Sequence, residues 1–171
     1  VVVLEGIPAS STSKPLLLGI RTALAEYPGL SVAASVRGDY QRDIACAAVT
    51  ALLAQGERFD AVIAANDSMA LGALDALAGR EPLPLVAGVN AVPEAIAEIK
   101  SGRMLATVDF DAMKMACIAT EAAVRHLQGE TIPPRIALPV QVVDRSNCAA
   151  WDLPYEAREC PVWADVIRAQ P

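Results

Sequence analysis

The stretch FDAVIAANDSMALGALDAL at residues 59–77, followed by LPLVAGVNAVPEAIAEIKSGRMLATV at residues 83–108, decides the fold. Twice in this stretch a short apolar run ends in an asparagine, and an amphipathic helical pattern follows. Alternating buried strands and helices are typical of a parallel sheet covered by helices. Ligands of such sheets bind outside the carboxyl ends of the strands. Asn66 and Asn90, which end the two runs, are therefore the first candidates for ligand contact.

The same alternation extends over most of the chain and predicts an α/β fold, a doubly wound parallel sheet with helices on both faces. Strands are expected at 1–5, 30–36, 61–65, 84–89, 105–109 and 136–143. Helices are expected at 14–27, 41–55, 68–78, 93–102 and 111–128. Asp67 is expected to cap the helix that follows it, because its carboxylate can accept backbone N–H bonds.

Length, composition and charge restrict the class of protein. A chain of 171 residues corresponds to one domain, and its 54% hydrophobic but 4% aromatic content indicates a core of alanine, valine and leucine. The net charge of -6, with no basic run, argues against a nucleic-acid surface. No apolar stretch reaches the roughly 20 residues of a membrane span. The opening VVVLEG is expected to be a strand and not a signal peptide, as in one lobe of a larger protein.

Two parts of the deciding stretch, AANDSMALGAL and VAGVNAVPEAIAEIKSGRMLATV, resemble the second lobe of periplasmic sugar-binding proteins of ABC transporters, the ribose-binding type. LacI-type repressors share that fold. The resemblance implies that residues 1–146 form the C-terminal ligand-binding lobe of a type I periplasmic binding protein. It also implies that the helix at 111–128 packs on a first lobe of the same protein. The tail at 147–171 carries no family signal and is expected to be irregular.

The resemblance implies a function as well. In this family two lobes close about a hinge on a sugar or polyol, and an ABC importer then recognises the closed form. The expected partners are a small sugar or polyol, the membrane subunits of the transporter, and the first lobe of the same protein. No direct contact with nucleic acid, no catalysis, no cofactor and no metal is expected. The expected location is the periplasm.

Recognition of a sugar requires planar polar side chains that exchange hydrogen bonds with neighbouring hydroxyls, and a ring that covers an apolar face. By resemblance, Asn66 occupies the position of a ligand-binding asparagine, and Asn90 stands where the family has an aspartate. Lys14 replaces an arginine that clamps the ligand, an exchange that is not conservative. Tyr40 corresponds to an aromatic residue on the sugar face. These four residues are expected to converge at one edge of the sheet; the alternatives are turn asparagines, a solvated lysine and a surface tyrosine.

Three further residues are candidates for the same site. Ser10 lies in the loop after the first strand and can offer a hydroxyl. At the expected hinge the sequence reads LATVDFD where the resembled family has LATVAQ. Phe110 therefore stands at the position of the family's glutamine, and Asp109 beside it is expected to supply the polar contact. The alternative for both is a hinge residue that is simply packed.

The four cysteines fall into two groups. Cys46 and Cys117 lie in alanine-rich helical patterns and are expected to be buried free thiols. Cys148 and Cys160 flank an irregular, proline-containing segment, and a disulfide between them would pin the tail in an oxidising compartment. Such a bridge would contribute about 3 kcal/mol in the chain-entropy model. Two free thiols in a cytosolic tail are the alternative, and the cysteine spacing does not suit structural zinc.

Several other functions are weighed against this one. The effector-binding domain of a LacI-type transcription regulator and the periplasmic sensor domain of a signalling kinase are the nearest alternatives. The loop GIPASSTSKP lacks the second glycine and the hydroxyl residue of a phosphate-binding loop. A Cys–His hydrolase would require His126 beside Cys46 or Cys117, but His126 lies on a long expected helix among polar residues. Asp109 and Asp111 are better explained by a hinge and a helix start than by the carboxylate pair of a glycosidase.

Overall fold

The computed structural model of the protein describes residues 1–110, 112–154 and 157–169. Its strands are β1 (Val2–Glu5), β2 (Ala34–Arg37), β3 (Ala61–Ala64), β4 (Leu85–Val89), β5 (Ala106–Asp109) and β6 (Gln141–Asp144). Its helices are α1 (Ser13–Ala25), α2 (Arg42–Ala54), α3 (Asp67–Ala76), α4 (Pro93–Ser101), α5 (Ala112–Leu127) and α6 (Trp163–Arg168), with a short 3-10 helix, η1 (Cys148–Trp151).

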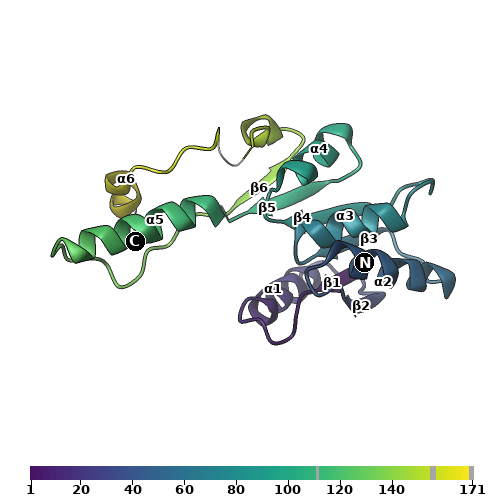
Figure 1. The fold of residues 1–171 in the computed structure, drawn as a ribbon. Coiled ribbons are helices and arrows are strands. Elements are labelled where there is room, and N and C mark those ends of the chain that lie inside the picture. The colour runs from purple at the N-terminus through teal and green to yellow at the C-terminus, as the bar shows by residue number, and fades with distance from the viewer. Residues whose placement is uncertain (111, 155–156, 170–171) are drawn as a thin grey trace.

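The strands form one sheet in the order β2-β1-β3-β4-β5-β6 (Figure 1). Strands β1 to β5 are parallel, and β6 runs antiparallel to β5. The chain first steps outward from β1 to β2, then crosses back and continues through β3, β4 and β5. Because crossovers between parallel strands are right-handed, α1 lies on one face of the sheet and α2, α3 and α4 lie on the other. The predicted α/β fold class is thus confirmed.

The elements follow the predicted order, with shorter strands at both edges of the sheet. β2 begins at Ala34, later than expected, because its pairing with β1 starts opposite Val2. β6 also begins later than expected, after Pro139, which lacks the N–H that a strand ladder requires. Asp111, the expected first residue of α5, lies outside the described residues.

The core lies between the sheet and the helices that cover it. Its largest fully buried side chains are Leu4, Met69, Leu74, Leu77, Ile96 and Ile99. α3 is buried along most of its length because it packs closely on α2. A Cβ at Gly72 would lie 2.1 Å from the backbone oxygen of Arg42, so a glycine is required where these two helices meet.

A buried carboxylate joins α3 to the sheet. Asp67 is 0% exposed. Its Oδ1 accepts a hydrogen bond from the Thr107 hydroxyl of β5 at 2.7 Å, and its Oδ2 accepts one from the backbone N–H of Val92 at 2.9 Å. Burial raises the pKa of Asp67, although these two hydrogen bonds oppose that shift.

The prediction that Asp67 caps α3 is wrong. The N-cap is Asn66, whose side-chain oxygen accepts from the backbone N–H of Met69 at 2.9 Å. Asparagine and aspartate cap helices about equally well, so local chemistry does not choose between neighbours. Tertiary contacts decide which residue caps the helix: the Asp67 carboxylate is bonded to Thr107 of β5, and Gly88 of β4 leaves room for it. A Cβ at Gly88 would lie 2.3 Å from Asp67 Oδ1.

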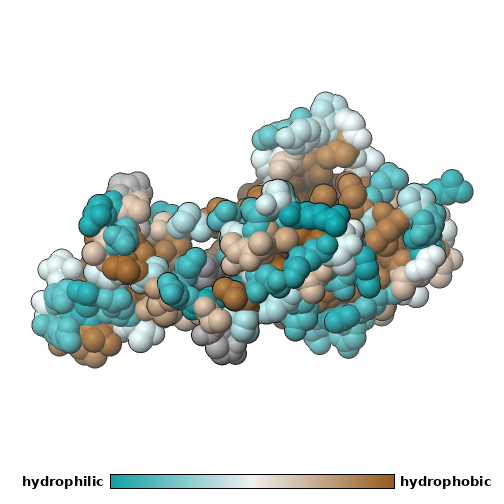
Figure 2. Space-filling view, turned by 90° about the horizontal axis from the view of Figure 1, so that it is seen from above, coloured by the Kyte–Doolittle hydropathy of each residue, from teal (hydrophilic) through white to brown (hydrophobic). Residues whose placement is uncertain are grey.

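α5 and the connection at 128–140, which we call the arm, project away from the sheet (Figure 1). Within α5 only Ile118 is buried, whereas Met115 is 49% and Val124 48% exposed. Apolar side chains interrupt the hydrophilic surface of this part of the molecule in Figure 2. A groove of about 500 Å³ runs between α5 and the connection and is lined by apolar residues, among them Ile118 and Ile136. The arm thus presents apolar surface that the described part of the chain leaves open.

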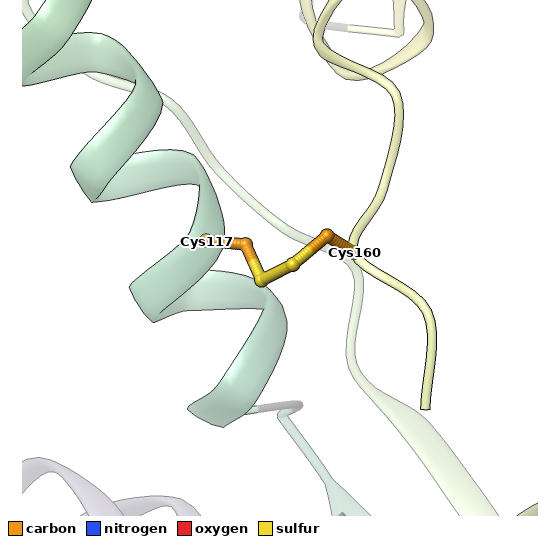
Figure 3. Close-up of a disulfide and its surroundings, with 2 residues drawn as sticks. All are labelled: Cys117 and Cys160. Atoms are coloured by element: carbon orange, nitrogen blue, oxygen red, sulfur yellow. A yellow bond between two sulfur atoms is a disulfide. The ribbon is translucent and has the colours of Figure 1, made fainter. Parts of the chain in front are cut away.

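The tail is more ordered than expected and is tied down differently. It contains η1 and α6, and only residues 155–156 and 170–171 lie outside the described residues. The predicted Cys148–Cys160 disulfide is wrong: Cys160 is bonded to Cys117 of α5 (Figure 3). Cys148 is instead a free thiol buried in the core cluster, and Cys46 is a free, half-buried thiol. Of the helices described, none is both long and apolar enough to cross a membrane.

We expect Asp67→Ala to lower the free energy of unfolding by about 2–4 kcal/mol, because it leaves the buried Thr107 hydroxyl and the Val92 N–H without their acceptor. Asp75→Ala is the matched control: its ion pair with Arg42 is exposed, so its loss should cost less than about 1 kcal/mol. Urea denaturation at neutral pH measures both. Because the folded-state pKa of Asp67 is raised, the wild type gains stability as pH falls through that pKa, and the gap to Asp67→Ala should widen in acid. Equal losses in the two variants would contradict the role of the buried carboxylate.

Peptide mapping of the unreduced protein should recover Cys117 linked to Cys160, with Cys46 and Cys148 alkylated as free thiols. The bridge spans 43 residues, for which the chain-entropy model gives about 4 kcal/mol. Cys160→Ser should therefore make the tail more susceptible to limited proteolysis, whereas Cys46→Ser, which removes a free thiol, should not. A peptide that joins Cys148 to Cys160 would overturn the pairing.

Candidate functional site

The sheet reverses its winding between β1 and β3, and such a switch point is where doubly wound sheets bind ligands. The loop that follows β1 and the turn that follows β2 meet there. The Tyr40 hydroxyl is hydrogen-bonded to Ser13 Oγ at 2.7 Å and to Thr12 Oγ1 at 3.3 Å. Ser10 Oγ is in turn 2.8 Å from Thr12 Oγ1. The first loop, in which Ser10 was predicted, and Tyr40 are thus joined by a chain of hydroxyls.

Tyr40 itself is held in an uncommon conformation. Its φ is 62°, and that of Asp39 is 50°, both in the left-handed region that favours glycine. The ring lies directly against the backbone of Gly6, where an added Cβ would be 2.1 Å from the ring carbon Cζ. A glycine after β1 is therefore what allows the ring to lie over the switch point.

The electrostatic state of Tyr40 follows from the same contacts. Burial raises the pKa of its phenol, but hydrogen bonds with Ser13, Thr12 and Ser10 outweigh that effect and lower the pKa overall. The hydroxyl is therefore engaged within the protein. What Tyr40 can offer to a ligand is its ring.

Asn66 links this group to α3. Its Nδ2 donates to the backbone oxygen of Tyr40 at 3.2 Å, while its Oδ1 caps α3 through Met69. A primary amide has a second N–H and a second lone pair, which these contacts leave for a further partner. The structural role expected as the alternative for Asn66 is therefore present, and it is compatible with ligand contact.

Asn90 lies at the end of the neighbouring strand β4. It and Ala91 have φ values of 124° and 52°, so both residues of this turn depart from the usual backbone. The backbone N–H of Asn90 donates to Val108 at 2.8 Å, and that of Ala91 donates to Thr107 Oγ1 at 3.2 Å. Together with the Asp67 bond to Val92, these contacts hold the backbone of the turn that carries the half-buried Asn90 side chain.

The structure brings several of the predicted residues to one edge. Asn66 and Asn90 follow the carboxyl ends of β3 and β4, which are adjacent and parallel, and Tyr40 is hydrogen-bonded to Asn66. Lys14 lies in the first turn of α1, directly after Ser13, and is exposed. Contact of these residues with a ligand remains a prediction.

The two hinge candidates are engaged elsewhere. Asp109 is 4% exposed, and its Oδ2 accepts a hydrogen bond from Trp151 Nε1 of the tail at 2.7 Å. Phe110 lines the apolar groove of the arm together with Met115 and Ile118. The end of β5 therefore contributes a tail contact and an apolar side chain, and a role for either residue at a hinge or in ligand binding remains a prediction.

Sequence reasoning missed three residues that shape the site. Thr107 of β5 holds both Asp67 and the Asn90 turn, and its signal was a polar residue within an apolar strand. Thr12 and Ser13 hold Tyr40, but a serine- and threonine-rich loop does not show which hydroxyl will reach which partner. All three act through residues distant in sequence, which is why local patterns did not identify them.

The arrangement suits binding of a polar ligand. Two amides, a ring and a set of hydroxyls surround the edge, and such groups exchange hydrogen bonds with a polyhydroxylated molecule. Among the residues that the structure describes, no group of three or more histidine, cysteine, aspartate or glutamate side chains could hold a metal ion.

Comparison with known proteins agrees with this fold. Residues 1–131 match the model of the periplasmic binding protein domain family. The D-ribose/D-allose-binding protein of Pseudomonas aeruginosa is 30% identical over 131 residues, which are 75% of this chain and 41% of that protein. A solute-binding protein of an ABC transporter from Actinobacillus succinogenes, solved with bound D-allose, is 31% identical with a TM-score of 0.81 and covers 87% of this chain and 53% of that one.

A second solved structure supports the same relationship. The ABC transporter solute-binding protein of Bacillus halodurans, with bound myo-inositol, is 27% identical with a TM-score of 0.83 and covers 88% of this chain and 53% of that one. The chain thus spans about half the length of the relatives it matches. The resemblance found in the sequence is confirmed, and the chain belongs to the periplasmic binding protein family, of the ribose-binding type.

Proposed function

We propose that this chain is the C-terminal lobe, residues 1–146 with an ordered tail, of a periplasmic solute-binding protein that captures a sugar or polyol for an ABC importer. The observation that supports the proposal is that Asn66 and Asn90 end the adjacent parallel strands β3 and β4, and that Asn66 is hydrogen-bonded to the backbone of Tyr40 beside the switch point of the sheet. Parallel sheets bind ligands at this edge, and amides beside a ring suit a molecule that has hydroxyls on its rim and an apolar face.

The class of ligand follows from the chemistry of this edge. Asn66 retains a donor and an acceptor beyond its structural bonds, and Asn90 can offer both. Vicinal hydroxyls, each a donor and an acceptor, complement such amides better than a carboxylate or phosphate would. Relatives of this family with similar sequence or structure have D-ribose, D-allose or myo-inositol in their names or bound to them. These three compounds are the first ligands to test.

Closure of two lobes is the proposed mechanism. The chain spans about half of its relatives, and α5 exposes an apolar face that its own described residues leave uncovered. We propose that α5 packs on a first lobe of the same protein and that the ligand bridges the two lobes. Binding then stabilises the closed form because the ligand makes its full set of contacts only there. The membrane subunits of the importer are the proposed partners of that closed form, in the periplasm.

Asn90→Ala should weaken binding of the preferred ligand by about 10- to 100-fold, because two hydrogen bonds between an amide and hydroxyls are lost. Isothermal titration of the two-lobed protein with D-ribose, D-allose and myo-inositol measures this. Gln55→Ala is the matched control, since it removes an exposed side-chain amide at the end of α2, before β3. Asn90→Asp should change the order of preference among the three ligands, because a carboxylate accepts but does not donate. Unchanged affinity in Asn90→Ala would rule out the ligand contact.

Tyr40→Phe and Tyr40→Ala separate the ring from the hydroxyl. The hydroxyl is bound to Ser13 and Thr12, so Tyr40→Phe should cost stability, by about 1 kcal/mol, and change affinity only about two- to threefold. Tyr40→Ala removes the ring and should weaken ligand binding by about tenfold or more. Thermal unfolding and titration of the same samples distinguish the two effects. If Tyr40→Phe loses as much affinity as Tyr40→Ala, the hydroxyl and not the ring contacts the ligand.

A further inference from the structure

The tail returns to the carboxyl edge of the sheet after η1. Trp151 is bound to Asp109 at the end of β5, and Asp152 forms an ion pair with Lys100 of α4. Figure 1 shows the tail passing from the neighbourhood of α4 to α6, which lies beside α5. Arg158 lies in the segment between these attachments, at residues 151–152, and helix α6.

The guanidinium of Arg158 joins the tail to the turn that carries Asn90. Its Nη2 donates to the backbone oxygen of Ala91 at 3.0 Å and to that of Trp151 at 3.3 Å. Its Nε donates to the backbone oxygen of Leu153 at 3.4 Å. One planar side chain thus binds carbonyls of the tail and a carbonyl of the turn after β4.

The turn that Arg158 contacts is strained and requires support. Left-handed backbone at non-glycine residues costs about 1–3 kcal/mol at each position, and two such residues, Asn90 and Ala91, are adjacent here. The N–H of Ala91 donates to Thr107, and the N–H of Val92 donates to Asp67. Arg158 binds the carbonyl of Ala91, a residue that is 0% exposed.

We infer that Arg158 is a positioning residue for the ligand amide: it fixes the backbone of Ala91 and thereby the direction of the Asn90 side chain. This inference rests on the proposed function, because it assigns Asn90 to the ligand. It makes the tail, which carried no family signal in the sequence, a part of the binding site. Arg158 itself does not touch the ligand.

The side chain must be an arginine for geometric reasons. Its fork holds several N–H donors in one plane, and the contacts to Leu153, Trp151 and Ala91 come from two different nitrogens of that plane. A lysine offers one compact ammonium on a flexible stem and cannot span these carbonyls in the same way. The tail is also anchored two residues later, where Cys160 is bonded to Cys117 of α5. Arg158 is therefore fixed from both the sheet and the arm.

The test is a double-mutant cycle between Arg158 and Asn90 in the two-lobed protein, titrated with D-ribose, D-allose and myo-inositol. Arg158→Met should weaken binding of the preferred ligand by about tenfold, and Arg158→Lys should restore only part of that loss. In the Asn90→Ala background, Arg158→Met should have almost no further effect, because the amide that it positions is gone. A full, additive loss in that background would overturn the inference. Arg168→Met, which removes an exposed arginine of the same tail, is the control and should bind as the wild type does.

Hydrogen exchange gives a second readout that needs no ligand. The amides of Asn90, Ala91 and Val92 are all bonded, and they should exchange about tenfold faster in Arg158→Met while those of α2 are unchanged. Exchange equal to that of Arg168→Met would overturn the positioning role. If the wild type binds none of the three compounds, the proposed ligand class fails, and the exchange experiment still decides whether Arg158 holds the turn.

Discussion

The Asp67 carboxylate is the contact on which the candidate site depends. It is the residue after Asn66, and it is bound to Thr107 of β5 and to the turn that follows Asn90. One buried group therefore sets the positions of loops that follow two different strands. A buried carboxylate is costly unless its oxygens are satisfied, and here both oxygens accept hydrogen bonds. Gly88 of β4 provides the space, so the constraint reaches into the middle of the sheet.

This arrangement separates support from recognition. Structural bonds take up the Tyr40 hydroxyl, the Asp67 carboxylate and the Ala91 backbone, whereas the Asn66 amide has a second N–H and a second lone pair for a further partner. A site held in this way needs little reordering when a ligand arrives, which lowers the entropic cost of binding. The same logic explains why left-handed backbone persists at Tyr40 and at Asn90: each strained turn is held by contacts from other elements.

Sequence patterns predicted the order of the strands and helices because apolar periodicity is a local property. They also placed Asn66 and Asn90 at one edge, since that follows from parallel strands alone. The Asp67 cap and the Cys148–Cys160 pairing were wrong for a shared reason: each was judged from near neighbours in the sequence. Their actual partners, Thr107 and Cys117, are 40 and 43 residues away, and only the path of the chain brings them close. The ordered helices of the tail were missed because η1 packs on α4 and α6 packs on α5, contacts that no periodic pattern of their own indicates.

The tail adds an attachment of the arm to the rest of the molecule. Without the tail, α5 would be joined to the sheet only at its ends, through the link at Phe110 and through the connection to β6. The Cys117–Cys160 bridge and the contact of Arg125 with the Trp163 ring, 5.1 Å from its centroid, add a third attachment. That attachment leads directly to Arg158 and the Asn90 turn. The tail therefore connects the arm, through Cys117–Cys160, to the backbone of the turn that carries Asn90, through Arg158 and Ala91.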